Sequence, residues 1–400
     1  MANIIEKIIM TKTDSDFNTG DIIKIKVDWA MVHDGTIVLT QKYFNKIALK
    51  VFNNEKIYVV FDHLYPPNNE NTANLLNDAR TFIKEQGIKN FYEGGEGICH
   101  QILLETEEIK KGDFLVGADS HSSTVGAKSC LSMGVGATDM AYIFSTGETW
   151  IKVPECIKIK MIGKLNKNVT YKDVFLKIVK DLGIDGASYK GIVYEAEENI
   201  SIDDKAVLCN MGVEIGAKFS IFEDSLDGNL RSDSDEDFEK VYVYNLEEVG
   251  CNIACPNDIN EVLAAELISD IKIDVAFIGT CTGGRLSDFI QAAEILKNKK
   301  ISKGVRLLLA PSSRNILIEI IQNGVLLTLI KAGAVLLPVG CGPCLGGHLG
   351  VLGENEVAIS TANRNFLGRM GSKSSEIYIG SANMVAHAAL KGFIGEMNDV

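Results

Sequence analysis

Short apolar runs rich in β-branched residues alternate along this chain with longer helical patterns and glycine-rich connections. The run over residues 57–61 precedes a helical pattern over residues 72–86, and another apolar run follows at residues 114–117. Runs that are apolar on both faces and separated by amphipathic stretches are typical of parallel strands covered by helices. The pattern therefore predicts an α/β fold built on parallel sheets.

The length of the chain predicts more than one domain, because 400 residues exceed what a single hydrophobic core usually holds. The alternation of strands and helices restarts near residues 155 and 268. We therefore expect three α/β domains, over residues 1–155, 156–268 and 269–400.

The sequence argues against a membrane or a nucleic acid as the main partner. The most apolar stretch, residues 325–339, is interrupted by Lys331 and Gly333 and is too short to cross a bilayer. The first residues lack the continuous apolar segment and cleavage site of a secretory signal. A formal net charge of −13 opposes non-specific attraction to phosphates. We expect a cytoplasmic protein.

Three of the nine cysteines follow predicted strands directly. Cys281 comes after the apolar run at residues 275–278, and Cys341 and Cys344 come after the run at residues 334–339. Because ligands collect at the carboxyl ends of parallel strands, we expect these three thiolates to converge from two neighbouring turns. An odd number of cysteines in a reducing compartment makes a disulfide framework a poor explanation.

Three thiolates suit a [4Fe–4S] cluster in which one iron has no protein ligand and can act as a Lewis acid. A zinc site with His348 as its fourth ligand and a pair of plain buried thiols both remain open alternatives. The other cysteines are predicted to pack as small apolar side chains: Cys99, Cys130, Cys156, Cys209, Cys251 and Cys255.

Arginine and histidine are concentrated in the glycine-rich motifs. Three of the seven arginines lie there, at Arg285, Arg364 and Arg369. A guanidinium group captures carboxylates with paired donors, so these residues predict an anionic substrate. Five of the six histidines also lie beside glycines or carboxylates, which fix imidazole tautomers and raise their basicity: His33, His63, His100, His121 and His348.

Taken together and in order, these motifs resemble those of one family, from about Ile22 to the C-terminus. The markers are Asp62-His63, Gly97–Gln101, Gly117–His121, Gly134–Asp139, Cys209–Gly216, Gly279–Arg285, Gly340–Cys344 and Asn363–Arg369. The chain resembles the large subunit of the aconitase-type hydro-lyases, in particular split forms such as 3-isopropylmalate dehydratase and homoaconitase.

The resemblance implies that Cys281, Cys341 and Cys344 hold one [4Fe–4S] cluster per chain, with one iron left to bind substrate. It implies three carboxylate–imidazole pairs around that iron: Asp62 with His63, Asp119 with His100, and Glu214 with His121. It also implies that other residues line the cluster or bind substrate: Ser120, Asn210, Asn363, Arg364 and Arg369.

The same resemblance implies three doubly wound α/β/α subdomains around a central cluster, without the mobile swivel domain that supplies a serine base in single-chain relatives. Only about fifty residues follow Cys344, which is too short for another domain. We therefore expect a heterodimer with a separate small subunit that supplies the swivel domain and the base.

The expected activity is reversible dehydration of a hydroxy di- or tricarboxylate, with the isomerisation of 2-isopropylmalate and 3-isopropylmalate in leucine biosynthesis as the first choice. Homoaconitase, citramalate/citraconate dehydratase and 2,3-dimethylmalate dehydratase are alternatives, because few pocket contacts select the substrate side chain. The chain departs from the family pattern at Gly283, where many relatives have asparagine. The segment His33–Val38 lacks the glutamine of full-length aconitases, which argues against citrate.

Two functions of other classes stay open at this point. One is a cluster-sensing RNA-binding regulator, which the net charge and the retained catalytic-type residues disfavour. The other is a structural protein held together by zinc.

Overall fold

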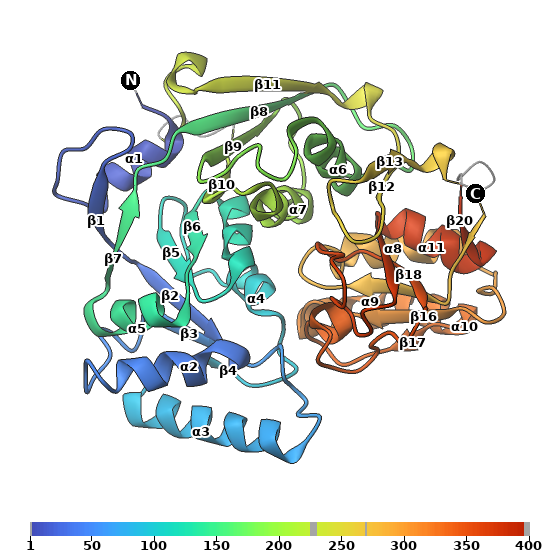
Figure 1. Ribbon diagram of the computed structural model, residues 1–400, viewed down its shortest axis with the longest axis horizontal. Helices are drawn as coiled ribbons and strands as arrows, with labels where there is room; N and C mark the ends of the chain where they lie inside the picture. The colour runs from blue at the N-terminus through green and yellow to red at the C-terminus, as the bar shows by residue number, and fades with distance from the viewer. Residues whose placement is uncertain (1, 225–229, 269, 396–400) are drawn as a thin grey trace. The chain divides into compact units, whose positions relative to one another are not determined.

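The computed structural model describes residues 2–224, 230–268 and 270–395 (Figure 1). The chain divides into two compact units. Unit 1 comprises Met1–Glu93, Ile102–Lys164 and Asp185–Asn245, and unit 2 comprises Gly94–Gln101, Leu165–Ile184 and Leu246–Val400. The three domain ranges expected above stay predictions, and residue 269, at the start of the last range, lies outside the described residues.

Unit 1 contains a five-stranded sheet in the order β4-β3-β2-β5-β6, in which every pairing is parallel. Its strands are β2 (Trp29–His33), β3 (Ile57–Val60), β4 (Asn90–Tyr92), β5 (Phe114–Gly117) and β6 (Leu131–Gly134). Every residue of β2 and β3 is buried, as expected for strands that are covered on both faces.

The helices of this sheet are α2 (Asp34–Phe44), α3 (Glu70–Gln86) and α5 (Ala137–Thr146). Helix α4 (Cys99–Glu105) begins in the Gly94–Gln101 segment of unit 2 and ends in unit 1. Helix α2 contacts α3 and α5 (Figure 1). At this contact Phe44 meets Phe82 and Phe144 edge to face, with ring centroids 5.7 and 6.4 Å apart. Ile37 and Phe44 of α2 thus belong to an apolar cluster that also contains residues of α3 and α5.

A second sheet of unit 1 has the order β10-β9-β8-β11 and is also parallel throughout. Its strands are β8 (Cys156–Ile162), β9 (Gly191–Ala196), β10 (Phe219–Phe222) and β11 (Lys240–Asn245). Helix α7 (Ile202–Met211) packs against the 3₁₀ segment η1 (Ser120–Lys128). A Cβ atom at Gly126 of η1 would lie 1.8 Å from the carbonyl oxygen of Ser220, so this contact requires glycine.

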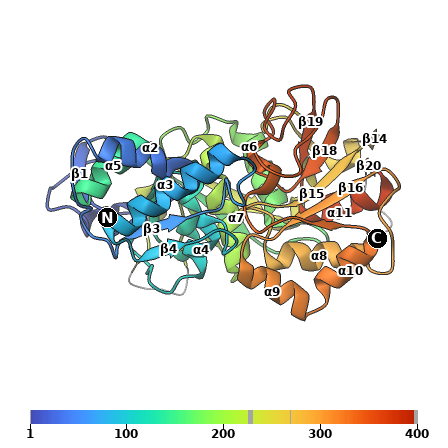
Figure 2. The same cartoon turned by 90° about the horizontal axis from the view of Figure 1, so that it is seen from below.

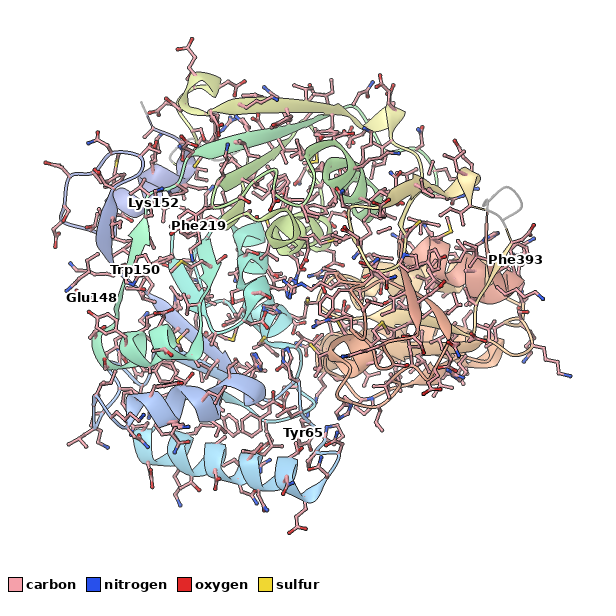
Figure 3. All side chains as sticks on the ribbon, in the orientation of Figure 1. Tyr65, Glu148, Trp150, Lys152, Phe219 and Phe393 are labelled. Atoms are coloured by element: carbon pink, nitrogen blue, oxygen red, sulfur yellow. The ribbon has the colours of Figure 1, made fainter. Side chains whose placement is uncertain are left out.

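The remaining elements of unit 1 are α1 (Ile4–Met10), the antiparallel strands β1 (Ile22–Lys26) and β7 (Glu148–Lys152), and the short 3₁₀ segments η2 (Gly212–Ile215) and η3 (Asp235–Asp237). The side chains of Glu148, Trp150 and Lys152 are labelled on β7 in Figure 3. Residues between them are buried, which is the alternation of a strand with one wet face.

Unit 2 is built on a seven-stranded sheet in the order β13-β12-β19-β18-β15-β16-β17. Its strands are β12 (Asn252–Ala254), β13 (Val262–Ala264), β15 (Val275–Gly279), β16 (Arg306–Ala310), β17 (Val335–Leu336), β18 (Val357–Ser360) and β19 (Glu376–Ile379). The five strands from β19 to β17 are parallel, while β12 runs antiparallel to both β13 and β19.

The helices of unit 2 are α6 (Tyr171–Leu182), α8 (Leu286–Leu296), α9 (Arg314–Gln322), α10 (Val325–Ala332) and α11 (Ala382–Lys391). Helices α8, α9 and α10 pack against one another and lie together beside the sheet (Figure 2). The short elements are β14 (Ile271–Lys272) paired with β20 (Phe393–Ile394), and η4 (Leu246–Glu248), η5 (Ala265–Leu267) and η6 (Gly342–Leu345).

None of the described helices is long and apolar enough to cross a membrane on its own; α9 and α10 meet the length and hydropathy criteria only as a pair, bent by 82°.

One sequence expectation about the sheet is wrong. The strand expected over residues 334–339 consists of Val335 and Leu336 alone, because β17 is an exposed edge strand that pairs only with β16. Since β16 lies between β15 and β17, the two turns that carry the cysteines do not follow adjacent strands. They follow the carboxyl ends of strands in the same parallel set.

Candidate functional site: a thiol cluster and two carboxylate–imidazole pairs

The residues of the thiol site lie in the turns that follow three strands of the unit 2 sheet. Cys281 follows β15, Cys341 and Cys344 lie in the turn after β17, and Asn363 follows β18. All three thiols are buried, with exposed fractions of 5, 7 and 4% for residues 281, 341 and 344. The parallel topology therefore gathers four polar side chains from separate turns at one edge of the sheet.

The side-chain amide of Asn363 lies between two of the sulfurs. Its Nδ2 atom donates to the Sγ atom of Cys281 at 3.7 Å, and its Oδ1 atom is 4.0 Å from the Sγ atom of Cys344. The guanidinium group of Arg369 donates to the same Cys344 sulfur from Nη2 at 3.6 Å. N–H donors directed at sulfur favour the thiolate, which is the form that binds metal.

The other cysteines lie in a different environment. Burial raises the pKa of Cys130, Cys156 and Cys251 to about 12, and it raises the pKa of Cys209 and Cys255 as well. The Cys130 thiol donates to the carbonyl of Lys110 at 3.0 Å, as a neutral S–H group does. These thiols are inert packing groups.

The turn that carries Cys281 is strained and tightly packed. Thr280 has a φ of 74°, a left-handed conformation that a β-branched residue rarely adopts. The hydroxyl of Thr361 bridges the same turn, accepting from the Gly279 amide at 3.0 Å. A Cβ atom at Gly283 would lie 2.2 Å from the Cβ atom of Thr361. Thr361 thus leaves no space for a side chain at position 283.

Arg285 faces protein groups. Its side chain is 1% exposed, and its Nε atom donates to Oε1 of Gln101 at 3.2 Å. Its Nη2 atom donates to the carbonyl of Cys281. A β-bridge between Gly97 and Ser313 also joins the segment of Gln101 to the end of β16. Arg285 thus ties the turn of Cys281 to the segment of unit 2 that contains His100.

This donor set fits a [4Fe–4S] cluster. Three buried thiols come from two turns, and the sulfurs of Cys281 and Cys344 contact the same amide. Side-chain N–H groups already point at those two sulfurs, as hydrogen-bond donors to cluster sulfurs do.

In unit 1, His63 and Asp62 form a close pair. The Nδ1 atom of His63 lies 2.7 Å from Oδ1 of Asp62, which is 2% exposed. The carboxylate of Asp34 fixes the backbone here, accepting from the amides of His63 at 3.0 Å and Leu64 at 2.7 Å. A proton on Nδ1 bound to Asp62 leaves Nε2 as the nitrogen that exchanges protons with a ligand.

His33, which the sequence analysis assigned no role, stacks on His63. The two ring centroids are 3.9 Å apart with an interplanar angle of 23°. The Nδ1 atom of His33 accepts from the amide of Gly35 at 3.1 Å, at the N-terminus of α2, so its Nε2 atom carries the proton. The Oδ2 atom of Asp119 lies 3.7 Å from Nε2 of His33 and 3.9 Å from Nε2 of His63.

The ligand atoms of His33, Asp34, Asp62 and His63 lie within 4.8 Å of one another, a spacing that also suits a metal ion. The oxygens of Asp34, however, already accept backbone amides at 3.0 and 2.7 Å. The group is therefore better described as an acid–base cluster. A histidine directly before an aspartate at a strand end was the sequence signal for His33.

Glu214 and His121 form the second pair of unit 1. The Nε2 atom of His121 is 2.7 Å from Oε1 of Glu214, and its Nδ1 atom is 3.3 Å from the hydroxyl of Ser120. Asn210 is fully buried in α7 and donates to the hydroxyl of Thr124 at 2.8 Å. The Ser120 hydroxyl, the imidazole and the carboxylate thus form a continuous chain along which a proton can move.

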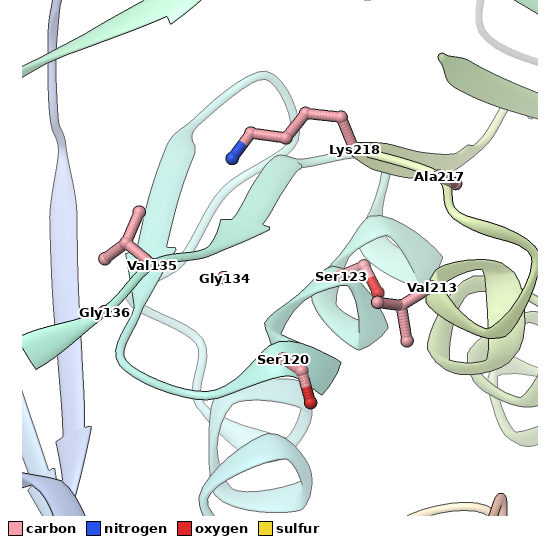
Figure 4. A pocket seen from close by; sticks show the side chains of 8 residues that line it. All are labelled: Ser120, Ser123, Gly134, Val135, Gly136, Val213, Ala217 and Lys218. Atoms are coloured by element: carbon pink, nitrogen blue, oxygen red, sulfur yellow. The ribbon is translucent and has the colours of Figure 1, made fainter. Parts of the chain in front are cut away.

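A cavity of about 370 Å³ lies beside this chain of groups in unit 1. Ser120 and Ser123 of η1, the loop Gly134–Gly136 and Lys218 line it (Figure 4). Burial lowers the pKa of Lys218, while the carboxylate of Asp139 acts in the opposite direction. The cavity has room for a small molecule and offers one ammonium group and two hydroxyls.

One predicted pair joins residues of different units. Asp119 belongs to unit 1 and His100 to unit 2, so their expected pairing stays a prediction. His100 is buried, with its Nδ1 atom 3.8 Å from the sulfur of Cys99. Arg364 is half-buried in the turn after β18, next to Asn363.

Comparison with known proteins identifies the family. A family model described as "Aconitase family (aconitate hydratase)" matches residues 6–227 and 256–392. The chain is 41% identical to the methanogen homoaconitase large subunit of Methanocaldococcus jannaschii, over 98% of both chains. It is 40% identical to the 3-isopropylmalate dehydratase large subunit of a Thermoanaerobacter species, over 99% of this chain and 98% of that one.

Among solved structures, the aconitase X of Thermococcus kodakaraensis has a similar fold, with a TM-score of 0.55. The likeness covers 94% of this chain and 88% of that chain at 13% identity, so it supports the α/β architecture alone. The family match and the relatives that align over nearly their whole length agree with the motifs described above. The chain belongs to the aconitase family.

Proposed function

We propose that this chain is the large subunit of a hydro-lyase that reversibly dehydrates a hydroxy di- or tricarboxylate. Relatives aligned over nearly the whole chain are named as large subunits of homoaconitase and of 3-isopropylmalate dehydratase. The observation that carries the proposal is Asn363, because its amide contacts the sulfurs of both Cys281 and Cys344.

Cys281, Cys341 and Cys344 would hold a [4Fe–4S] cluster in this proposal. When bound, such a cluster supplies an iron without a protein ligand, which acts as a Lewis acid on a substrate hydroxyl. Asn363 and Arg369 would orient the thiolates by donating hydrogen bonds. Zinc would also accept three thiolates, so metal analysis is part of the test below.

The imidazoles of unit 1 would move protons. A hydroxyl leaves more readily when it receives a proton, and we assign this transfer to the Nε2 atom of His63, whose Nδ1 atom is bound to Asp62 at 2.7 Å. His121, bound to Glu214 at 2.7 Å, would hold the hydroxyl of Ser120 in the site. Asp119, His100 and Asn210 would complete the polar groups around the substrate.

His33 would act as a fixed hydrogen-bond donor to the substrate. Its Nδ1 atom is occupied by the Gly35 amide at 3.1 Å, so its Nε2–H points away from α2. The carboxylates of the substrate would meet Arg364 and Arg369, since guanidinium groups bind carboxylates with two parallel donors.

A separate small subunit would complete the enzyme and supply the base that removes the carbon-bound proton. The names of the relatives, which all specify a large subunit, support a heterodimer. Three α/β/α subdomains around the cluster, no swivel domain in this subunit and a cytoplasmic location belong to the same proposal. Catalysis then requires both subunits.

Among the substrates of this class, 2-isopropylmalate and 3-isopropylmalate remain our first choice, with homocitrate and homoaconitate as the alternative. The relatives carry both names at similar identity, 41% for the homoaconitase subunit and 40% for the dehydratase subunit. Citramalate and 2,3-dimethylmalate are further candidates because they differ only in the side chain that the pocket selects.

The test is anaerobic purification and reconstitution of the chain with iron and sulfide, followed by metal analysis and visible absorption. We expect a brown protein with one cluster per chain, which loses iron in air and regains that iron with ferrous iron and thiol. The loaded chain, mixed with its small subunit, is then assayed on the four substrate classes. A colourless, zinc-containing protein, or a loaded heterodimer inactive on all four, would falsify the proposal.

A further inference from the structure

Lys172 is a buried cation near the thiol site that no part of the proposed reaction uses. It is the second residue of α6, and its side chain is 4% exposed. A lysine in the first turn of a helix is unfavourable, because the helix dipole is positive there. Removing its ammonium group from water adds a further cost. A position with both penalties indicates a compensating anion.

The hydrogen bonds of Lys172 lead directly to the thiol site. Its Nζ atom donates to the carbonyl of Thr361 at 2.9 Å and to that of Ala362 at 3.2 Å. These two residues immediately precede Asn363, whose amide contacts the sulfurs of Cys281 and Cys344. Lys172 therefore holds the turn that places Asn363.

The acceptors of Lys172 are neutral carbonyl oxygens, which compensate a full charge only in part. The neighbouring Asp173 directs its carboxylate to the amides of Thr170 at 2.8 Å and Asn252 at 2.9 Å. Burial lowers the pKa of Lys172 to about 8, and the buried guanidinium group of Arg285 lowers it further. Asp288 and the thiols of Cys281 and Cys344 act in the opposite direction. The carboxylate of Asp288 and the sulfurs of Cys281 and Cys344 are thus the groups of negative charge that act on this ammonium group.

We infer that Lys172 is a positioning residue that orients Asn363 and supplies the buried positive charge that balances the thiolate ligands of the cluster. The inference rests on the proposed function, because it needs the cluster as the anion. Three thiolates outweigh the charge of an oxidised [4Fe–4S] core, so the loaded site is negative and gains from a nearby cation. Reduction adds another electron and raises that benefit.

Two variants distinguish the effect of the Lys172 charge from the effect of its hydrogen bonds to the turn that carries Asn363. Lys172→Met removes both the charge and the donors, whereas Lys172→Gln keeps an N–H donor for the carbonyls without the charge. Lys177→Met is the matched control, because Lys177 lies on the same helix and pairs with Asp181 at the surface. Each variant is purified anaerobically, reconstituted and titrated electrochemically, and the thiols of its metal-free form are alkylated over a range of pH.

We expect both Lys172 variants to disfavour reduction of the cluster about tenfold, a shift of about −59 mV for one electron. Alkylation of Cys281 and Cys344 in the metal-free protein should slow about tenfold near neutral pH, because fewer thiolates are present without the cation. Lys177→Met should match the unmodified protein in both measurements.

Two results would overturn the inference. If Lys172→Gln matches the unmodified protein in potential and alkylation, Lys172 only supports the turn. If Lys172→Met also matches it, Lys172 has no part in the site. Failure of the unmodified chain to assemble any cluster is a different result, because it contradicts the proposed function itself. If Lys172→Met does not fold, the Gln variant alone decides.

Discussion

The polar groups of unit 1 and the thiols of unit 2 are arranged in contrasting ways. In unit 1, imidazoles meet carboxylates at 2.7 Å, a distance typical of strong charge-assisted hydrogen bonds. In unit 2, the sulfurs of Cys281 and Cys344 meet an amide and a guanidinium group at 3.6–4.0 Å. In unit 1 each imidazole has a protein carboxylate as its hydrogen-bond partner. The thiols of unit 2 are instead arranged in a way that suits a ligand that bonds to sulfur.

This contrast separates the two kinds of chemistry. A proton site needs side chains whose tautomers are fixed, and two close carboxylate–imidazole pairs provide that. A cluster site needs thiolates held apart by the width of the cluster, with donors around them. If the proposed function holds, damage to the thiol site of unit 2 should remove the cluster, and damage to the pairs of unit 1 should leave the cluster but remove turnover.

The largest expected effect follows from Cys344→Ser. A serine hydroxyl replaces the thiolate poorly as an iron ligand, so we expect loss of the cluster absorption and no measurable turnover, with the fold retained by circular dichroism. Cys255→Ser is the control, because this half-buried cysteine lies outside the thiol site. An active, iron-replete Cys344→Ser protein would contradict the ligand assignment.

A smaller effect is expected from Glu214→Gln, which keeps the shape of the side chain but removes its charge from His121. We expect kcat to fall about 100-fold or more while the cluster absorption and iron content stay unchanged. Glu239→Gln, at a surface ion pair with Lys190, is the control. Unchanged turnover would show that the Glu214 carboxylate is dispensable. Loss of iron would contradict the assignment of proton transfer to unit 1 and of cluster binding to unit 2.

His33→Asn tests the role that the sequence analysis did not assign. Asparagine is a good helix N-cap and can accept from the Gly35 amide as His33 does, but it has no counterpart of the His33 Nε2–H. We expect kcat/KM to fall about tenfold, the worth of one hydrogen bond, with Tm unchanged. His33→Ala should lower Tm as well, because the cap is lost. A fully active Asn variant would restrict His33 to capping α2.

The smallest effect concerns the pH dependence of the metal-free protein. Burial holds the pKa of Lys172 at about 8 in the folded chain, below its ordinary value of 10.5. The unfolded chain therefore binds more protons between these values, and stability relative to Lys172→Met should rise from pH 8 to 10.5, by at most about 3 kcal/mol. Urea unfolding at several pH values measures this difference, and a difference that falls with pH would contradict the sign.

Much of the fold followed from local pattern. The strands over residues 57–60, 114–117 and 275–279 and the helix over residues 70–86 lie where the sequence pattern predicted them. Such runs carry their own signal, because a strand buried on both faces needs an unbroken set of apolar side chains. The extent of the edge strand β17 was not predicted correctly, because its two residues are exposed and pair with a strand on one side.

The candidate site was predicted in part. The cysteines and most of the polar residues stood in recognisable motifs, and the contacts of His63 with Asp62 and of His121 with Glu214 are present at 2.7 Å. The stacking of His33 on His63 and the hydrogen bonds of Lys172 to Thr361 and Ala362 were not predicted, because these partners lie far away in the sequence. Arg285 was expected to hold substrate, yet it donates to Gln101 and Cys281 within the protein.

The order of residues along the chain was enough to indicate parallel α/β layers, thiols at strand ends and imidazoles beside carboxylates, since each depends on neighbours a few positions away. Tertiary structure alone decided that β16 separates the two cysteine turns, that His33 stacks on His63 and that Lys172 is buried beneath the turn of Asn363. Those contacts join segments far apart in the chain, and they form only when strand order and helix packing bring the segments together.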